Sequence, residues 1–544
     1  MTAPRSPTRL AFAAAARIAA IPLAACAEPP DDDGARTSAR LEVGPPVVCP
    51  APEARDTLGP LAPPLTGGDW GRQPYDPDNA DLFTGGGLLV ADLDGDGLHD
   101  LLLPRPDASR LYRQGPVGTF TDVSPFTLPP DPDGERVGAT AVDLDGDDAL
   151  DVVLTGYRTA PVYWHNLGDG RFEDLTAAAG LTDPVPGRRT TTASAADWDL
   201  DGDLDLFIAG FGPFYADPRG DGDPSSFHIN RGDGTFEHAS HLVPTSAHIG
   251  YTFVGGWQHL NEDPYPDLYL VNDFGHFQPN QLLWNRAGVW EPDDGAAGLT
   301  VPVQGMGLGW GDLDGDGRTD VAVAGWGNNR LMLSGGGAGW FEGHQARGFD
   351  GDLDRGQQIG WASITADLDA DGDLDLVEGF GAVAGQGPPL DQPDEIFRHQ
   401  PDGQFEPVGE RWGFAHPGQT RGVLAVDVDG DGWLDLARRD LTGPATVQLA
   451  RCGAAAWTII RLDDPDHANH RGIGARVRVL ADGAWQEATV DAGSHGVMSG
   501  GPPELHFGLG GARRVERIEV RWPDGDTDTV GPAPARRVLK VHRR

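Results

Sequence analysis

The stretch ADLDGDGLHD, residues 91–100, places four aspartates within nine positions, together with two glycines. Carboxylates this close repel one another: two unit charges 4 Å apart cost about 1 kcal/mol in water and about 4 kcal/mol near a protein surface. A folded chain accepts such crowding when the side chains splay into solvent, or when a cation lies among them.

The pattern recurs along the chain as D-x-D-x-D-[GD]-x-x-D, with aspartate at positions one, three, five and nine. The six full copies contain Asp92, Asp94, Asp96 and Asp100; Asp143, Asp145, Asp147 and Asp151; Asp197, Asp199, Asp201 and Asp205; Asp312, Asp314, Asp316 and Asp320; Asp367, Asp369, Asp371 and Asp375; and Asp427, Asp429, Asp431 and Asp435. A seventh, altered copy has His259, Asn261, Asp263 and Asp267 at these positions. Chance does not produce six copies of this spacing, so we interpret the loops as cation sites.

Calcium is the cation that fits these loops. Carboxylates at positions one, three, five and nine and the carbonyl at position seven offer an all-oxygen shell, and glycine at position six permits a sharp turn. Magnesium demands stricter octahedral geometry, and zinc prefers His or Cys. We predict about six calcium sites and a degenerate seventh. Besides the aspartates above, the predicted position-seven ligands are Leu98, Asp203, Arg318, Asp373 and Trp433.

An EF-hand is the competing interpretation, and it requires a glutamate at position 12 and helices on both sides. The six copies have Leu103, Leu154, Ile208, Val323, Glu378 and Arg438 at position 12. The flanking segments, such as GVLAVD before and DVVLTG after a loop, are short, apolar and rich in Val and Leu, which is typical of strands. Each loop is therefore predicted to be a turn between two strands.

The first aspartates recur at intervals of about 51 to 62 residues. The second half of most repeats contains a hairpin signal, as in VYWHNLGDGRFEDL and FHINRGDGTFEHA. One repeat thus predicts one four-stranded sheet, and seven such sheets arranged radially form a seven-bladed β-propeller. A linear solenoid is the alternative, although its repeats are usually shorter and no capping segment is visible.

The repeats resemble the FG-GAP or VCBS repeats of integrin α-subunit propellers. The segments NHRGIGARVRVLADG (469–483) and ELHFGLGGARRVERIEVRWPDGDT (504–527) resemble an ASPIC/UnbV domain. The combination, over residues 81–544, resembles the cartilage acidic protein family and its bacterial relatives. This resemblance implies a propeller that serves recognition or adhesion. Asp148, at a turn-glycine position, and the altered fourth loop depart from the family pattern.

We expect an all-β chain in four parts. These are a lipoprotein signal peptide (1–26), a Pro-rich acidic tether (27–80), the seven-bladed propeller (81–453) and an ASPIC/UnbV domain (454–544). The last part has short alternating runs separated by turns, which predicts a small β-sandwich-like module, and its WPDG segment is interpreted as a turn.

The first 26 residues resemble a secretory signal, with arginines before an Ala-rich apolar stretch. LAAC (23–26) matches a bacterial lipobox, which makes Cys26 a predicted lipidation site, and ACA (25–27) is also a site for ordinary cleavage. We therefore expect a location in the cell envelope, as an outer-membrane lipoprotein or a secreted protein, with the membrane contacted only through the lipid anchor.

Two cysteines, Cys49 and Cys452, remain for an oxidising compartment, and we predict a disulfide between them. The seventh repeat lacks a terminal hairpin and passes directly into the C-terminal domain. A strand near VVCP (47–50) could supply the missing outer strand, close the ring and bring Cys49 beside Cys452.

The net charge of −42 lies almost entirely before residue 454, because 13 Lys/Arg offset 12 Asp/Glu from there onward. Such an acidic surface disfavours nucleic acid and anionic membranes. We expect a monomer whose partner is an extracellular protein or a carbohydrate.

No catalytic motif of the G-x-S-x-G, H-E-x-x-H or phosphate-loop type is visible. Six of the 16 histidines gather near the fourth repeat: His228, His238, His241, His248, His259 and His276. They indicate either a ligand pocket or transition-metal site, or ordinary core and loop histidines, and we favour the second interpretation. The sequence predicts a calcium-binding adhesion module and no enzyme; the alternative is a propeller-based polysaccharide lyase or hydrolase.

Overall fold

The computed structural model describes residues 39–47, 85–115, 118–131, 134–182, 187–212, 222–248, 250–327, 329–349, 358–383, 391–450, 452–493 and 496–543. The chain divides into a unit of residues 1–36, which lies outside these ranges, and a unit of residues 37–544, to which everything below belongs. No helix within the described ranges is long and apolar enough to cross a membrane.

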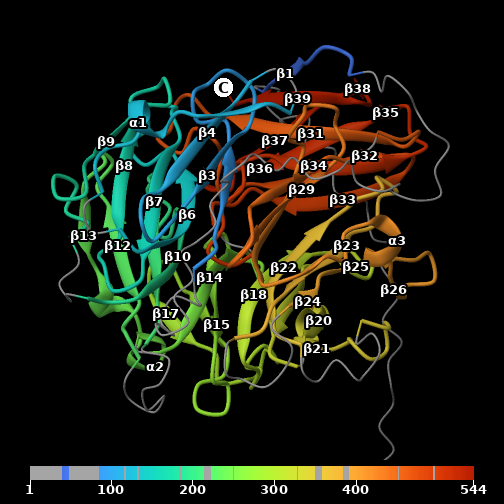
Figure 1. Ribbon diagram of the computed structural model, residues 1–544. Coiled ribbons are helices and arrows are strands. Elements are labelled where there is room, and N and C mark those ends of the chain that lie inside the picture. Colours follow the sequence, from blue (N-terminus) through green and yellow to red (C-terminus); the bar gives the residue numbers. More distant parts are fainter. Residues whose placement is uncertain are drawn as a thin grey trace, which may run out of the picture. The chain divides into compact units, whose positions relative to one another are not determined.

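Seven antiparallel sheets follow one another along the described residues, and we call them blades one to seven (Figure 1). Blade one consists of β2 (Leu89–Ala91), β3 (Asp100–Leu103), β4 (Arg110–Gln114) and β5 (Phe120–Asp122). Blade two consists of β6 (Arg136–Val142), β7 (Asp151–Gly156), β8 (Val162–Asn166) and β9 (Phe172–Asp174). Blade three consists of β10 (Thr190–Ala196), β11 (Asp205–Gly210), β12 (Ser226–Asn230) and β13 (Phe236–His238). Blade four consists of β14 (Thr252–Gln258), β15 (Asp267–Asn272), β16 (Gln281–Asn285) and β17 (Trp290–Pro292).

The remaining blades follow the same order. Blade five consists of β18 (Gly305–Gly311), β19 (Asp320–Gly325), β20 (Arg330–Ser334) and β21 (Trp340–Glu342). Blade six consists of β22 (Gly360–Ala366), β23 (Asp375–Phe380), β25 (Glu395–His399) and β26 (Phe405–Pro407). Blade seven has three described strands, β28 (Thr420–Val426), β29 (Asp435–Asp440) and β30 (Thr446–Gln448). Short connections contain α1 (Ser124–Thr127), η2 (Ser240–Leu242), α2 (Thr245–His248), η3 (Gly336–Ala338), α3 (Gly409–Trp412) and the paired β24 (Gln392–Pro393) and β27 (Pro417–Gly418).

Apolar side chains between neighbouring blades hold the sheets in a ring. The first strands of the blades are almost fully buried, and the strands of each blade pair in chain order. Leu88 and Val90 of blade one share a hydrophobic core with Leu424 and Val426 of blade seven, which closes the ring. The prediction of an all-β propeller is confirmed.

The C-terminal domain contains two four-stranded sheets and a short strand pair. One sheet has the order β1 (Arg40–Val43), β39 (Arg537–His542), β31 (Ala456–Asp463) and β34 (Leu505–Gly510). The other has the order β33 (Ala484–Thr489), β32 (Arg476–Ala481), β36 (Arg517–Arg521) and β37 (Thr527–Val530), and β35 (Arg514–Val515) pairs with β38 (Ala533–Pro534). Ile460, Val477, Ile518 and Leu539 belong to one hydrophobic core of this domain.

One described strand, β1, lies within the expected N-terminal tether. β1 pairs antiparallel with β39, and Leu41 packs against the C-terminal core (Figure 1). β1 thus extends a sheet of the C-terminal domain, while the ring-closing strand expected near VVCP (47–50) lies mostly outside the described residues and stays a prediction. Cys26 and Cys49 lie outside the described residues. Cys452 is disulfide-bonded, and its pairing with Cys49 stays a prediction.

A loop of the C-terminal domain, described at residues 491–493 and 496–501, runs along the first strands of several blades, and we call these residues the plug. Isolated β-bridges join Ala492 to β10, Gly496 to β18 and Gly500 to β2. The carbonyl of Met498 accepts a hydrogen bond of 3.2 Å from the amide of Ala139 in β6.

The tip of the plug is part of the propeller core. Val497 is 0% exposed and Met498 1% exposed. Both share a hydrophobic core with Phe253 and Trp361, which belong to the first strands of blades four and six. The C-terminal domain therefore fills the space that the first strands enclose. Nothing in the composition of DAGSHGVMSGG predicts this, because the segment has no strand or helix period.

We predict that Gly493→Ala destabilises the protein more than Gly483→Ala. Both glycines have positive φ, +72° and +78°, so alanine costs about 1–2 kcal/mol at either position. A Cβ at residue 493 would lie 2.3 Å from the carbonyl oxygen of Ala193, whereas nothing lies within 4 Å of one at residue 483. Overpacking adds about 1–3 kcal/mol in the first variant only. Calorimetric melting of both variants checks this, and equal melting temperatures would contradict the placement of the plug.

Candidate metal centres

Each acidic loop connects the first and second strands of its blade. In blade two, β6 ends at Val142, the loop follows, and β7 begins at Asp151. The position-nine residue is likewise the first residue of the second strand in the other six blades: Asp100, Asp205, Asp267, Asp320, Asp375 and Asp435. The altered fourth loop therefore occupies the same place in its blade as the six full copies.

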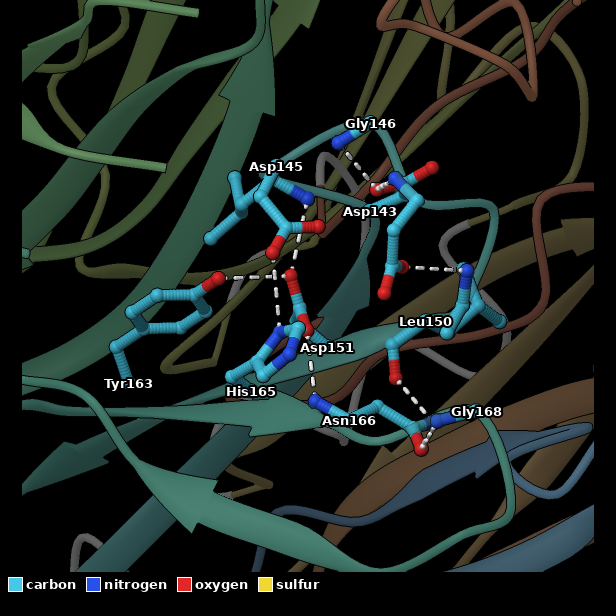
Figure 2. A network of polar contacts seen from close by, with 12 residues as sticks. Asp143, Asp145, Gly146, Leu150, Asp151, Tyr163, His165, Asn166 and Gly168 are labelled. Carbon is cyan, nitrogen blue, oxygen red and sulfur yellow. Dashed lines mark hydrogen bonds and ion pairs between the residues drawn. The ribbon is translucent and has the colours of Figure 1, made fainter. Parts of the chain in front are cut away.

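The position-nine carboxylate fastens the loop to the third strand. In blade two, Oδ2 of Asp151 accepts a hydrogen bond from the amide of Leu144 (3.1 Å), and Oδ1 accepts one from the amide of Asn166 (2.8 Å) (Figure 2). The other six position-nine aspartates accept the same two kinds of amide. The sequence predicted these residues only as metal ligands, and the structure gives them a role in holding the blade together.

Positions one and five are oriented by main-chain amides of their own loop. Oδ2 of the position-one aspartate accepts the position-six amide in all six full copies, at 2.9 Å between Asp92 and Gly97. Oδ1 of the position-five aspartate accepts the position-seven amide, at 2.9 Å between Asp96 and Leu98. These bonds wrap the loop around its own carboxylates.

Buried carboxylate oxygens without a hydrogen-bond partner remain in all six full copies. They are Oδ1 of Asp92, Asp145, Asp197, Asp199, Asp314, Asp369 and Asp427, all at position one or three. An unpaired buried acceptor is costly, and high-resolution structures contain few of them. The oxygens of positions one, three and five also lie within 4.8 Å of one another in loops one, two, three and five. These donors fit a hard cation that takes oxygen ligands.

Burial and mutual repulsion raise the pKa of many of these carboxyls. Burial raises the pKa of Asp143 and Asp197 to about 7, and Asp201 adds repulsion to Asp197. Burial and neighbouring aspartates raise the pKa of Asp367 and Asp427 well above the usual value. Without a compensating positive charge, several of these groups hold a proton at neutral pH. A bound cation would favour the ionised form.

Basic side chains reach the position-three carboxylate in four loops. In loop two, Nδ1 of His165 lies 3.1 Å from Asp145 and 3.1 Å from Asp151, and the hydroxyl of Tyr163 donates to Asp151 (Figure 2). The hydrogen bond to Asp151 raises the pKa of His165 to about 9, so the ring is a cation. The other pairs are Arg113–Asp94 (2.6 Å), Arg347–Asp314 (3.1 Å) and Arg398–Asp369 (2.5 Å). Three of these bases, Arg113, His165 and Arg398, directly precede the last residue of a third strand, a position that sequence reasoning missed.

Loop four pairs its position-three and position-five side chains within the protein, while Nδ1 of His259 at position one is buried without a hydrogen-bond partner. Nδ2 of Asn261 donates to both carboxylate oxygens of Asp267 (3.0 and 3.3 Å), and Arg286 pairs with Asp263 (2.8 Å). Nε2 of His259 donates to the carbonyl of Gly474 in the C-terminal domain (3.0 Å). Burial lowers the pKa of His259 to about 4, so the ring is neutral. The loop has exchanged carboxylate ligands for protein contacts, as its altered sequence indicated.

The histidines near the fourth repeat lie on different elements. His228 and His238 belong to β12 and β13 of blade three, and His259 belongs to loop four, so their assignment to a single blade was wrong. His228 is 2% exposed, and burial lowers its pKa to about 3. The ring of His228 lies 5.3 Å from that of His238. The ring of His228 is thus buried and neutral, whereas His238 beside it is exposed.

Neighbouring loops are connected through third-strand amides. Nδ2 of Asn166 donates to the carbonyl of Leu93 in the preceding loop (2.8 Å), and Asn230 makes the same bond to Leu144 (2.8 Å). Gln114 links blade one to blade seven through the carbonyl of Val428 (3.0 Å). The asparagine of the N-x-G-D-G hairpin signal is thus also an inter-blade contact.

The C-terminal domain lies against the acidic loops. Nε2 of His470 donates to the carbonyl of Gly146 in loop two (2.8 Å). Arg471 donates to the carbonyl of Asp148 (2.8 Å) and pairs with its carboxylate (2.9 Å). This ion pair gives Asp148 a reason to replace the usual turn glycine, and its φ of 72° is the conformation that glycine would adopt.

The FG-GAP-like repeat model matches residues 92–154, 143–208, 259–323, 312–378 and 382–437, and the model described as ASPIC and UnbV matches residues 465–544. The chain belongs to the FG-GAP-like repeat family and carries a C-terminal ASPIC and UnbV domain.

Two relatives are similar over most of the chain. Cartilage acidic protein 1 of Homo sapiens is 24% identical over 474 residues, which cover 81% of this chain and 69% of the relative. Cartilage acidic protein 1 of Mus musculus is 24% identical over 505 residues, which cover 85% of this chain and 76% of the relative. Among solved structures, an Agrocybe aegerita lectin that recognises non-reducing terminal N-acetylglucosamine has 17% identity and a TM-score of 0.37, covering 61% of this chain and 83% of the lectin.

We predict that Asp316→Ala and Asp263→Ala, both at position five, have different effects in calcium. Asp316 lies in a loop with an unpartnered oxygen, so its loss should remove one bound ion and about 2.7 kcal/mol of stabilisation at a hundredfold excess of calcium over Kd. Asp263→Ala loses an ion pair with Arg286, worth about 0–1 kcal/mol, and a hydrogen bond from the Tyr265 amide, worth about 1 kcal/mol. Calcium titration calorimetry and melting curves measure both quantities. The same stoichiometry for both variants would count against a site in loop five.

We predict that the calcium-free protein is more stable at pH 5 than at pH 7. Burial raises the folded-state pKa of Asp100, Asp143, Asp197 and Asp320 from 3.8 to about 7. The folded state then holds protons that the unfolded chain has released, so the free energy of unfolding falls as pH rises through the window from about 4 to 7. Melting temperatures of metal-free protein across this range check the sign. With saturating calcium the fall should disappear, because the ion takes the place of the protons.

Proposed function

We propose that the chain is a calcium-stabilised extracellular binding module whose rigid propeller and docked C-terminal domain present a surface to a protein or glycan. The observation that carries this proposal is the contrast between loops. Each of the six full copies has a buried carboxylate oxygen without a partner, whereas the buried atom without a partner in the described loop four is a ring nitrogen, Nδ1 of His259. A role for calcium explains why the six loops keep these oxygens.

Calcium would be held by the carboxylates of positions one, three and five, with the position-seven carbonyl and the position-nine carboxylate beside them. When bound, the ion supplies the positive charge that allows these groups to be ionised together. The chain itself supplies the orientation: amides of the loop fix positions one and five, and one amide of the loop and one of the third strand fix position nine. The result is a set of rigid loops on one face of the ring.

A binding role is favoured over catalysis because the abundant carboxylates are committed to these loops. General acid–base chemistry works best with a group whose pKa lies near 7 and which reaches the substrate. A bound cation depresses the pKa of its carboxylate ligands, which removes them from that role. We place the protein in the cell envelope or outside the cell, lipidated at Cys26 or cleaved beside it, and we propose that it acts as a monomer.

Chelation tests the calcium part of the proposal. Removal of calcium by EDTA at pH 7.5 should lower the melting temperature by many degrees, because several sites each add about 2.7 kcal/mol at a hundredfold excess over Kd. Magnesium, added to the calcium-free protein at the same concentration as calcium, serves as the control and should restore little of the lost melting temperature. A melting temperature that EDTA leaves unchanged would refute calcium stabilisation.

A ligand screen tests the binding part. The immobilised protein is exposed to glycans and envelope proteins in calcium and again in EDTA, and each bound species is assayed for chemical change. Calcium-dependent retention without product supports a binding module. Turnover of a polysaccharide or ester substrate would overturn it, and a screen that retains nothing would remove its support.

A further inference from the structure

A cavity of about 300 Å³ lies between the C-terminal domain and the acidic loops of blades one and two. Its walls include Asp92 and Leu93 of loop one, Asp147 and Asp148 of loop two, and Arg461, Arg471, Pro503 and Glu504 of the C-terminal domain. Small-molecule sites are often built at domain interfaces, and their volumes begin at about 300 Å³. The cavity is therefore large enough for one ring-sized group, and both domains contribute polar atoms to it.

Arg461 lines this cavity, and a hydrogen bond to Glu504 fixes the orientation of its guanidinium. Its Nε donates to Oε2 of Glu504 at 2.7 Å, and the side chain is 35% exposed. Glu504 is 9% exposed and also lies 3.6 Å from His99. An arginine has five N–H donors in a rigid fork, and the Glu504 bond uses only the one at Nε. The Glu504 carboxylate thus orients the Arg461 guanidinium, and the two terminal nitrogens of that guanidinium remain suited to a further anionic partner.

Arg471 is the second guanidinium of the cavity wall, and it is held in a similar way. Its Nη2 donates to the carbonyl of Asp148, and the same nitrogen pairs with the Asp148 carboxylate at 2.9 Å. Its Nε is buried and has no hydrogen-bond partner. This Nε is enclosed by protein, so an anion in the cavity would be met by the outer nitrogens of the guanidinium.

The remaining walls select the chemistry of the ligand. The carboxylates of Asp148 and Glu504, which are not among the predicted calcium ligands, accept hydrogen bonds, and the wall carboxylates together repel a highly charged anion such as phosphate or sulfate. Leu93, Leu150 and Pro503 add apolar surface. A monoanion that also carries hydroxyl donors and one apolar ring face matches all three properties: its carboxylate meets the guanidinium groups, and its hydroxyls meet the wall carboxylates.

We propose that this cavity binds one uronate residue of an acidic polysaccharide, with the sugar carboxylate paired to Arg461 and Arg471. The inference rests on the proposed binding function and names a site and a ligand class for it. A peptide carboxylate is the alternative occupant, but it lacks the ring of hydroxyl donors that the wall carboxylates would accept.

The test is saturation-transfer NMR and calorimetry on the full-length chain in calcium. The probes are glucuronate and galacturonate, their neutral counterparts glucose and galactose, and a glutamate-rich peptide. We expect the uronates to bind at least tenfold more tightly than the neutral sugars, because a charge-assisted pair contributes about 1.5–3 kcal/mol. Binding of the peptide in preference to the uronates would overturn the assignment.

Variants connect the binding to the cavity. Arg471→Gln, and the double change Arg461→Gln with Glu504→Gln, should each weaken uronate binding at least tenfold; the double change avoids leaving Glu504 buried and unpaired. Arg478→Gln is the matched control. Arg478 of β32 pairs with Glu487 of β33 and Glu519 of β36, and none of the three residues belongs to the cavity wall. Melting curves confirm that each variant is folded.

The two proposals fail in different ways. If the variants bind uronates as the wild type does, or if the wild type retains a protein or neutral glycan but no uronate, the cavity assignment is wrong and the binding module stands. If the wild type retains no ligand of any class, the binding function itself loses its support.

Discussion

The aspartate that begins the second strand of each blade is the residue on which the architecture depends. Its two oxygens accept amides from the acidic loop and from the third strand, so one side chain ties three segments together. This bonding comes with burial: Asp151 and Asp320 are both 0% exposed. Burial outweighs the amide bonds in Asp320, whose pKa rises to about 7. A blade built in this way contains a carboxylate that resists ionisation, and positions one and three add more carboxylates beside it. The demand for positive charge is thus a consequence of how the blade is fastened.

The repeated blades and their acidic loops could be predicted from the sequence, because the repeat is strict and its residues act locally. The spacing of Asp143, Asp145, Asp147 and Asp151 fixes a turn between two strands without any knowledge of the rest of the chain. The interactions that escaped prediction are those between segments far apart in sequence. β1 pairs with β39, about 500 residues away, and RLEV alone carries no sign of its partner. β31 and β39 pair in parallel, and their sequences do not specify the direction. The counter-ion His165 lies 14 residues beyond its carboxylate Asp151, and only the register of β7 with β8 brings them together.

The plug shows how a ring of separate sheets can gain cohesion from its centre. The described part of blade seven has three strands, and its apolar contact with blade one closes the ring from the side. The plug adds main-chain bonds to the first strands of blades one, two, three and five, and buries Val497 and Met498 among side chains of further blades. Separation of two neighbouring blades would therefore also break their contacts with the plug. Glycine matters here for steric reasons: a Cβ on Gly87 would lie 1.9 Å from the carbonyl oxygen of Met498.

Docking of the C-terminal domain and occupation of the loops cannot be independent. In loops two and seven, His470 and His506 of the domain donate to loop carbonyls, those of Gly146 and Gly432. These carbonyls belong to backbone that also carries the carboxylates, so an ion that fixes the loop fixes the docking acceptors. Loop four makes its contact through His259 itself, at the first ligand position, and so has given up that ligand for docking. If calcium binds these loops as proposed, the coupling free energy is reciprocal: whatever the ion contributes to docking, docking contributes to the affinity for the ion. The domain contacts and the acidic loops thus form one thermodynamic unit, and the cavity between them belongs to it.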